Sequence, residues 1–180
     1  MEHWIAGVLE CWNDMLKTIK AETLRAGNAR FAIVASQYNA CYVDAMLRAA
    51  RAELKQAGAK EVQVVRVPGA YEIPVVAGRL ARASSAQATR NAQHATGLSA
   101  IICLGVILRG ETVHAAHIGE AVSRALMQIQ VQHEVPVIHE VLLLENEKQA
   151  RARCLDRKRN RGREAAQTAL AMARVMAGLG

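Results

Sequence analysis

Residues 105–119 read GVILRGETVHAAHIG, and this stretch decides how the chain folds. It begins within an apolar run, Ile101 to Leu108, that is typical of a buried strand. The polar turn that follows has the character of a helix start, with Thr112 able to cap it and His114 in the first turn. A helix that begins where a strand ends directs backbone N–H groups at one spot, which favours a phosphate or another anion. The segment therefore predicts an anion cradle with an imidazole beside it, suited to chemistry on a phosphorylated small molecule.

The remaining sequence repeats this alternation of strand and helix. Apolar runs predict strands at 31–36, 62–67, 100–108 and 137–144, and helical periodicity predicts helices at 41–57, 71–80, 113–132, 146–157 and 163–178. The small, polar residues 82–98 lack an apolar period, so we expect a surface loop there. Alternation of this kind implies an α/β fold in which helices cover both faces of a four-stranded parallel sheet. The segments SQYN, VPGAYE and LRGETVH should then meet at the carboxyl edge of the sheet, where such folds bind ligands.

The first thirty residues differ from the rest. Residues 4–19 carry an apolar helical stripe, which predicts an N-terminal amphipathic helix in an extension of residues 1–30, ahead of a domain of residues 31–180. We expect this helix to pack on the body or on a neighbouring subunit. A helix lying on a membrane surface is the weaker interpretation, because the polar face mixes acids with lysines. This start does not look like a signal peptide, and no apolar stretch is long enough to cross a membrane. The four scattered cysteines favour reduced thiols, so we expect a cytoplasmic protein.

The net charge of +7 is concentrated near the C-terminus. The basic residues of this region are Arg151, Arg153, Arg157, Lys158, Arg159, Arg161 and Arg163. They are compatible with a solvated helix end, with a nucleic-acid patch, or with arginines that complete the phosphate site. Aromatic side chains for base stacking are absent from this stretch, which argues against nucleic acid as a partner.

Four motifs in order resemble the 6,7-dimethyl-8-ribityllumazine synthase family. They are IVAS-x-Tyr-Asn at 33–39, VPGAYEIP at 67–74, GVILRGETVH at 105–114 and NRGREAAQTALAM at 160–172, and the resemblance covers roughly residues 30–178. It implies a flavodoxin-like, three-layer αβα fold. It also implies condensation of 5-amino-6-(D-ribitylamino)uracil with 3,4-dihydroxy-2-butanone 4-phosphate to give the lumazine, phosphate and water, in riboflavin biosynthesis. The family uses neither a metal nor a redox cofactor.

The resemblance assigns substrate contacts residue by residue. Tyr38, followed by Asn39, matches the aromatic that stacks on the pyrimidine, and a flat ring suits a flat heterocycle. Glu72 matches the ribityl-binding carboxylate. The surrounding contacts implied by the resemblance are Ala70 and Tyr71 for the ribityl chain, Val106, Ile107 and Leu108 for the uracil edge, and Gly110, Glu111 and Thr112 for the phosphate. Arg153 matches the arginine that pairs with the phosphate, and its planar fork suits an oxyanion.

The same resemblance assigns the catalytic residues. His114 matches the proton-transfer residue, and imidazole titrates in the range that Schiff-base formation, phosphate elimination and ring closure require. Arg161 stands where the family commonly has lysine, and Glu164 matches a family glutamate. We expect both to orient the substrate and to set the electrostatics around His114.

Three departures from the family pattern concern the site. Ala115 stands where an aromatic usually follows the histidine, His139 stands where phenylalanine is common, and Arg161 replaces lysine. The resemblance places His139 near the pyrimidine of a neighbouring subunit, because the family forms homo-pentamers with active sites between neighbours. Some members assemble sixty subunits into an icosahedral shell, and riboflavin synthase is a candidate partner. A catalytically weakened, shell-forming scaffold is the alternative function.

Two other motifs carry less weight. Gly105 and Gly110 are spaced as in a P-loop, but Glu-Thr follows where Lys-Ser/Thr is required. His114, His117 and Glu120 recur at helical spacing, so a metal site on one helical face is conceivable, although such spacings often arise by chance.

Overall fold

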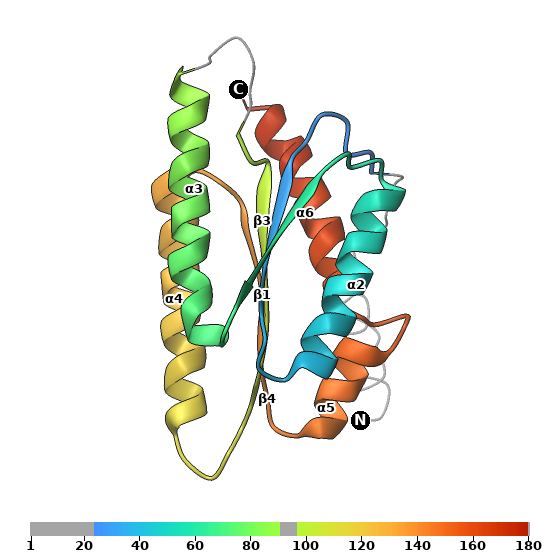
Figure 1. Cartoon of the computed structure of the whole chain (residues 1–180), viewed down its shortest axis with the longest axis vertical. Helices are drawn as coiled ribbons and strands as arrows, with labels where there is room; N and C mark the ends of the chain where they lie inside the picture. Colours follow the sequence, from blue (N-terminus) through green and yellow to red (C-terminus); the bar gives the residue numbers. More distant parts are fainter. Residues whose placement is uncertain (1–23, 91–96, 180) are drawn as a thin grey trace, which may run out of the picture.

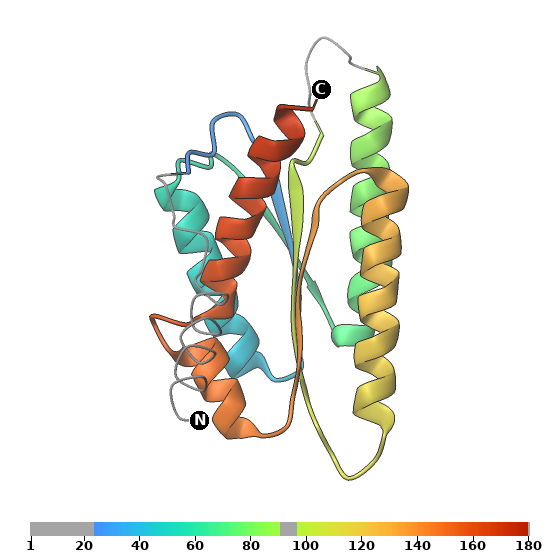
Figure 2. The same ribbon diagram turned by 180° about the vertical axis from the view of Figure 1, so that it is seen from behind.

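The sheet is four-stranded and wholly parallel, with the order β2-β1-β3-β4, in the computed structural model of residues 24–90 and 97–179. Its strands are β1 (Phe31–Ser36), β2 (Val62–Val67), β3 (Ala100–Leu108) and β4 (Val137–Leu144). The helical elements are α2 (Ala40–Gln56), η1 (Ala70–Glu72), α3 (Ile73–Arg90), α4 (His114–His133), α5 (Glu147–Ala150), the π-helical η2 (Arg151–Leu155) and α6 (Arg161–Ala177). Helices α3 and α4 cover one face, and α2, α5 and α6 cover the other (Figures 1 and 2). The predicted three-layer α/β fold and its four strands are confirmed.

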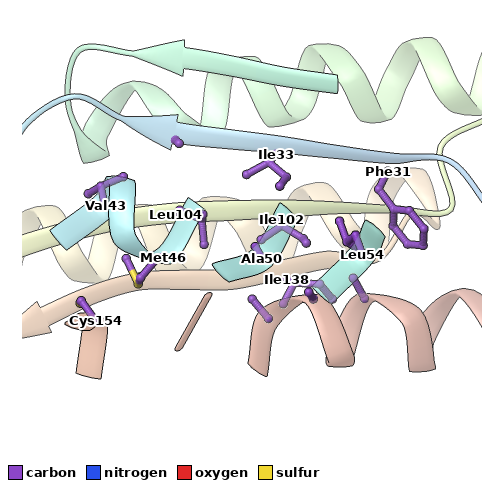
Figure 3. Packing of buried hydrophobic residues seen from close by; sticks show 14 of the residues in the cluster. Phe31, Ile33, Val43, Met46, Ala50, Leu54, Ile102, Leu104, Ile138 and Cys154 are labelled. Carbon is purple, nitrogen blue, oxygen red and sulfur yellow. The ribbon is translucent and has the colours of Figure 1, made fainter. Parts of the chain in front are cut away.

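The strands form because their residues are apolar on both faces. Every residue of β1 is buried, as are the first eight residues of β3, which is typical of central parallel strands between two helical layers. Alternate residues feed two cores. Ile33 and Ile102 pack towards α2 and α6 with Met46 and Leu54, as Figure 3 shows, whereas Val34 and its neighbours pack towards α3 and α4.

Helices α2 and α6 lie side by side because Gly162 allows close approach. A Cβ atom at this position would stand 2.0 Å from the backbone oxygen of Met46. Asn160 caps α6, and its Oδ1 accepts a hydrogen bond from the Gly162 N–H at 2.9 Å. The start of α6 is therefore fixed against the middle of α2.

The predicted loop at 82–98 is wrong for its first half, because α3 continues to Arg90. The buried side of this helix is built from Ala77, Ala81 and Ser84, whose spacing is helical but whose side chains are too small to give an apolar signal. Alanine also has the highest intrinsic helix propensity. Hydroxyls complete the packing: Ser84 Oγ accepts a hydrogen bond from the Leu98 N–H at 2.6 Å, and Ser85 Oγ donates to the His133 carbonyl at 2.7 Å.

The predicted N-terminal amphipathic helix lies outside the described residues. Ahead of β1, the Ala26 N–H donates to the Ala57 carbonyl at 2.8 Å, so the chain enters the domain beside the end of α2. In the part of the chain that the structure describes, no helix combines the length and apolarity needed to cross a membrane.

Candidate functional site

A cavity of about 1260 Å³ lies at the carboxyl edge of the sheet. The turn after β1, the η1 segment, the end of β3 and α4 as far as Gln128 surround it. The prediction that the three strand-end segments meet is therefore confirmed. The predicted site residues that line the cavity are Tyr38, Asn39, Ala70, Tyr71, Glu72, Val106, Ile107, Leu108, Gly110, Thr112 and His114.

Tyr38 stands over the backbone of Gly69. A Cβ atom at Gly69 would lie 2.9 Å from Tyr38 Cδ2 and 2.9 Å from Glu72 Oε2, so a larger residue there would force one of these side chains to move. Tyr38 is 71% exposed and lines the cavity, so its phenol ring presents a flat surface to any occupant. An exposed aromatic ring at a cavity wall is suited to stacking on a planar heterocycle.

Asn39 connects the turn after β1 to the end of β3. Its backbone has φ 56° and ψ 40°, a left-handed conformation that asparagine tolerates better than most residues. Its Nδ2 donates to the Val106 carbonyl at 2.8 Å. This contact is possible because β1 pairs with β3 only as far as Leu104, whereas β4 continues alongside β3 to Leu108. Beyond Leu104, the free side of β3 borders the cavity.

Glu72 is the half-buried carboxylate of the cavity wall. One of its oxygens, Oε2, accepts a hydrogen bond from the Gly69 N–H at 2.9 Å. The carboxylate therefore fixes the turn after β2 and also borders the cavity. A carboxylate has two acceptor oxygens, so it can hold this turn and still receive hydroxyl donors.

Residues 110–112 are expected to bind the phosphate, and this segment, called the phosphate turn below, lies between β3 and α4. Helix α4 begins at His114, and Val113 rather than Thr112 occupies the cap position. Thr112 Oγ1 accepts a long hydrogen bond of 3.4 Å from the His114 N–H, so the predicted capping role is only partly realised. Gly110 and His114 line the cavity, and both His114 and Thr112 are exposed. The positive end of the α4 dipole therefore meets the cavity beside an accessible imidazole.

Five predicted site residues do not line the cavity within one chain: Glu111, His139, Arg153, Arg161 and Glu164. Glu111 belongs to the phosphate turn and is exposed. The other four come from β4, η2 and α6. Two adjacent residues of β4 contact helices on opposite faces of the sheet. His139 contacts α4, whereas Glu140 contacts α6.

His139 belongs to a short hydrogen-bonded chain with α4. Its Nδ1 accepts from the Val141 N–H at 3.3 Å, so Nε2 carries the proton in the neutral ring and donates to Ser123 Oγ at 2.8 Å. Ser123 Oγ in turn donates to the Gly119 carbonyl at 2.7 Å. Burial lowers the pKa of His139 below its usual value, in keeping with a neutral imidazole.

Arg161 bridges two carboxylates on the other face. Its Nε and Nη2 donate to the two oxygens of Glu140 at 2.9 and 2.8 Å, and its Nη1 donates to Glu164 at 2.5 Å. Burial raises the pKa of Glu140 although Arg161 acts in the opposite direction. Within one chain, Arg161 and Glu164 therefore form an ion-pair cluster that the sheet separates from α4, rather than the surroundings of His114.

Glu140 and Ser123 were not predicted from the sequence as site residues. A single acid inside the apolar run VIHEVLLL was a usable signal for Glu140, because a buried charge requires a partner. His117 and Glu120 line the cavity with His114. Within residues 24–90 and 97–179, however, no three His, Cys, Asp or Glu side chains lie close enough together to hold a metal ion. This geometry gives no support to the conceivable metal triad.

Known proteins match most of the chain. The family model for 6,7-dimethyl-8-ribityllumazine synthase matches residues 28–177. A 6,7-dimethyl-8-ribityllumazine synthase of Xanthomonas campestris pv. campestris (strain B100) is 41% identical over 155 residues, which is 85% of this chain and 93% of that protein. A protein of the same name from Stenotrophomonas maltophilia (strain R551-3) is 39% identical over 151 residues, 83% of this chain and 90% of its own. On this evidence, the chain belongs to the 6,7-dimethyl-8-ribityllumazine synthase family.

Proposed function

We propose that this chain is a transferase of riboflavin biosynthesis that condenses 5-amino-6-(D-ribitylamino)uracil with 3,4-dihydroxy-2-butanone 4-phosphate. The products are 6,7-dimethyl-8-ribityllumazine, phosphate and water. The observation that carries the proposal is the shared cavity of Tyr38, Glu72 and His114, because an exposed aromatic ring, a carboxylate and an imidazole border one space.

The pyrimidine occupies the inner part of the cavity. Its ring stacks on Tyr38, and its polar edge meets the backbone at Val106–Leu108, where the side of β3 beyond Leu104 is free of β1. The ribityl hydroxyls donate to Glu72 and contact Ala70 and Tyr71. The flat ring and the flexible polyol are thereby held by different walls of one cavity.

The butanone phosphate occupies the mouth of the cavity. Its phosphate lies at the turn of Gly110, Glu111 and Thr112, at the positive end of α4. His114 then moves protons as the amine adds to the carbonyl, phosphate is eliminated and the second ring closes. These steps need no metal and no redox cofactor.

A second copy of the chain completes the site. Arg153 is exposed and does not border the cavity of its own chain. His139, Arg161 and Glu164 are half-buried, and they do not border this cavity either. The cap residue Val113 and the α4 residues Met127 and Val131 are 59–70% exposed, and burial of such apolar area favours association. We infer a homo-oligomer, with the family's pentamer as the unit, in which Arg153 of a neighbour pairs with the phosphate.

Larger assembly follows from the same unit. A shell of sixty subunits, with riboflavin synthase as its partner, is the further state that the family suggests. Residues 1–30 form an added segment on a catalytic domain of residues 31–180, and the whole functions in the cytoplasm. The alternative of a catalytically weakened scaffold is not favoured, because Tyr38, Glu72 and His114 remain together in an open cavity.

The proposal is tested by supplying both substrates to the purified chain. Formation of the lumazine, followed by its absorbance, should accompany release of an equal amount of phosphate. Native mass measurement on the same sample reports the oligomer. A correctly assembled oligomer without turnover would favour the scaffold.

A further inference from the structure

Arg66 lies directly behind the turn that carries Tyr38. It is the penultimate residue of β2, and its guanidinium makes contacts in two directions. Nη1 donates to Asp44 Oδ1 of α2 at 2.5 Å, and Nη2 donates to the Ser36 carbonyl, the last residue of β1, at 2.9 Å. The side chains of Arg66 and Asp44 are 30% and 41% exposed, so this interaction lies at the surface of the domain, outside the cavity.

These two contacts bracket the segment of residues 37–43. The Arg66 guanidinium contacts the residue before this segment, Ser36, and the residue after it, Asp44. The backbone adds further contacts on the same side: the Gln37 N–H donates to the Val67 carbonyl at 2.8 Å, and the Tyr38 N–H donates to the Pro68 carbonyl at 3.0 Å. The position of the Tyr38 ring over Gly69 therefore depends on how β2 holds the end of β1.

We propose that Arg66 is a positioning residue, which fixes the turn of Gln37–Asn39 so that Tyr38 and Asn39 meet the planar substrate. The inference rests on the proposed role of Tyr38 in stacking on the pyrimidine. Arginine is required because its rigid fork reaches a carbonyl and a carboxylate together, whereas lysine offers a single point charge. Asp44 acts with it by orienting the fork.

The consequence is confined to one substrate. A loosened turn displaces the stacking ring, whereas the phosphate turn lies between β3 and α4 and does not contact Arg66. Misplacement of a binding group by about 1 Å is enough to weaken productive binding by an order of magnitude or more. Loss of Arg66 should therefore raise KM for the pyrimidine roughly tenfold and leave KM for the butanone phosphate within about twofold.

The experiment compares Arg66→Met, Arg66→Lys and Asp44→Asn in the full-length oligomer. Steady-state KM values are measured for each substrate, and binding of the lumazine product is measured by its fluorescence without turnover. Arg163→Met is the matched control, because it removes an ion pair between α6 and Glu53 of α2 at 3.7 Å that does not contact the turn. Tyr38→Ala is measured in parallel as a test of the stacking role itself.

The expected result is a rise in pyrimidine KM and weaker product binding for Arg66→Met, a smaller rise for Asp44→Asn, and none for Arg163→Met. Arg66→Lys should not restore the wild-type values, and full restoration would overturn the proposal by showing that charge alone suffices.

If Tyr38→Ala weakens pyrimidine binding but Arg66→Met and Asp44→Asn do not, the positioning role is wrong and the proposed site stands. If Tyr38→Ala itself has no effect, the stacking assignment fails and the positioning role with it. Should Arg66→Met not fold, Arg66→Lys and Asp44→Asn decide by the same criteria.

Discussion

Arg161 and Glu140 are joined by two parallel hydrogen bonds across the boundary between α6 and β4, with Nε and Nη2 each donating to one carboxylate oxygen. The Glu140 side chain is 7% exposed and that of Arg161 is 34% exposed, so the carboxylate is desolvated and Arg161 is its main partner. A bidentate geometry of this kind is the strongest form of ion pair that side chains make. Because this ion pair joins α6 to β4, its loss should lower the stability of the fold.

Arg161→Met should destabilise the domain by about 3 kcal/mol, because it leaves the charge of Glu140 buried without its main partner. Urea unfolding at a fixed chain concentration measures this free energy. Arg151→Met is the control, since it removes an ion pair with Glu147 whose side chains are 67% and 68% exposed, and it should cost less than about 1 kcal/mol. Equal losses from the two variants would show that Glu140 is better solvated than the structure indicates.

Most of the fold was predictable because buried parallel strands read as continuous apolar runs. FAIVAS and AIICLGVIL are buried almost throughout, so their ends coincide with the ends of the observed strands. Helix α3 was cut short in the prediction, because Ala81 and Ser84 bury little area and carry no apolar period. Small buried residues form helices as well as large ones do, but they leave a weak pattern in the sequence.

The candidate site was predictable only where its residues follow the ends of strands. Tyr38, Glu72 and His114 each come within a few residues of such an end, so the topology brings them together. Contacts that depend on register and rotamer were not predictable. Arg66 and Asp44 meet because β2 pairs with β1 so that Val67 lies opposite Ser36, and no local pattern encodes that pairing.

Gly162→Ala should destabilise the protein by about 3 kcal/mol, at the upper end of overpacking costs, because the new Cβ would stand 2.0 Å from the Met46 carbonyl oxygen. Helices α2 and α6 would have to separate to admit it. Gly119→Ala is the matched control within α4, where the new Cβ would meet Leu143 at an ordinary 3.6 Å. That variant should be neutral or more stable by up to about 1 kcal/mol, since alanine favours helices. Thermal and urea unfolding measure both, and similar effects at the two positions would contradict the packing argument.

The stability of the wild type should fall, relative to His139→Gln, as the pH falls below about 6.5. Burial lowers the pKa of folded His139, so between the folded value and the ordinary value of 6.5 the unfolded chain binds more protons than the folded one. The contribution of neutral His139 is therefore complete above pH 6.5 and is lost as the pH falls through the folded pKa. Urea unfolding of both proteins at several pH values tests this, and parallel stability curves would show that His139 titrates equally in both states.

His114→Ala should slow turnover by roughly 10- to 1000-fold while leaving the oligomer intact, in line with the loss of a general acid-base group. His114 is exposed at the cavity, and among the described residues its ring makes none of the hydrogen bonds that position the phosphate turn. The control is His133→Ala at the far end of α4, whose backbone carbonyl accepts a hydrogen bond from Ser85 Oγ and is kept in the variant. Lumazine formation at saturating substrate gives the comparison, and an unchanged rate would remove His114 from the mechanism.

Arg153→Ala should raise the KM for the butanone phosphate much more than the KM for the pyrimidine, because the Arg153 guanidinium is proposed to pair with the phosphate in the cavity of a neighbouring copy. Steady-state kinetics with each substrate varied in turn measure both values.

The placement of Arg153 in a neighbour's cavity has a sharper consequence in mixed oligomers. Chains carrying His114→Ala lack the proton-transfer group in their own cavity but still offer Arg153 to a neighbour, whereas Arg153→Ala chains do the reverse. Co-assembly of the two variants therefore creates some cavities with both wild-type groups. At a low concentration of the butanone phosphate, the mixture should exceed the average rate of the separate variants, and native mass measurement confirms the mixing. Activity equal to that average in fully mixed oligomers would place Arg153 and His114 in the same chain's site, or would remove Arg153 from it.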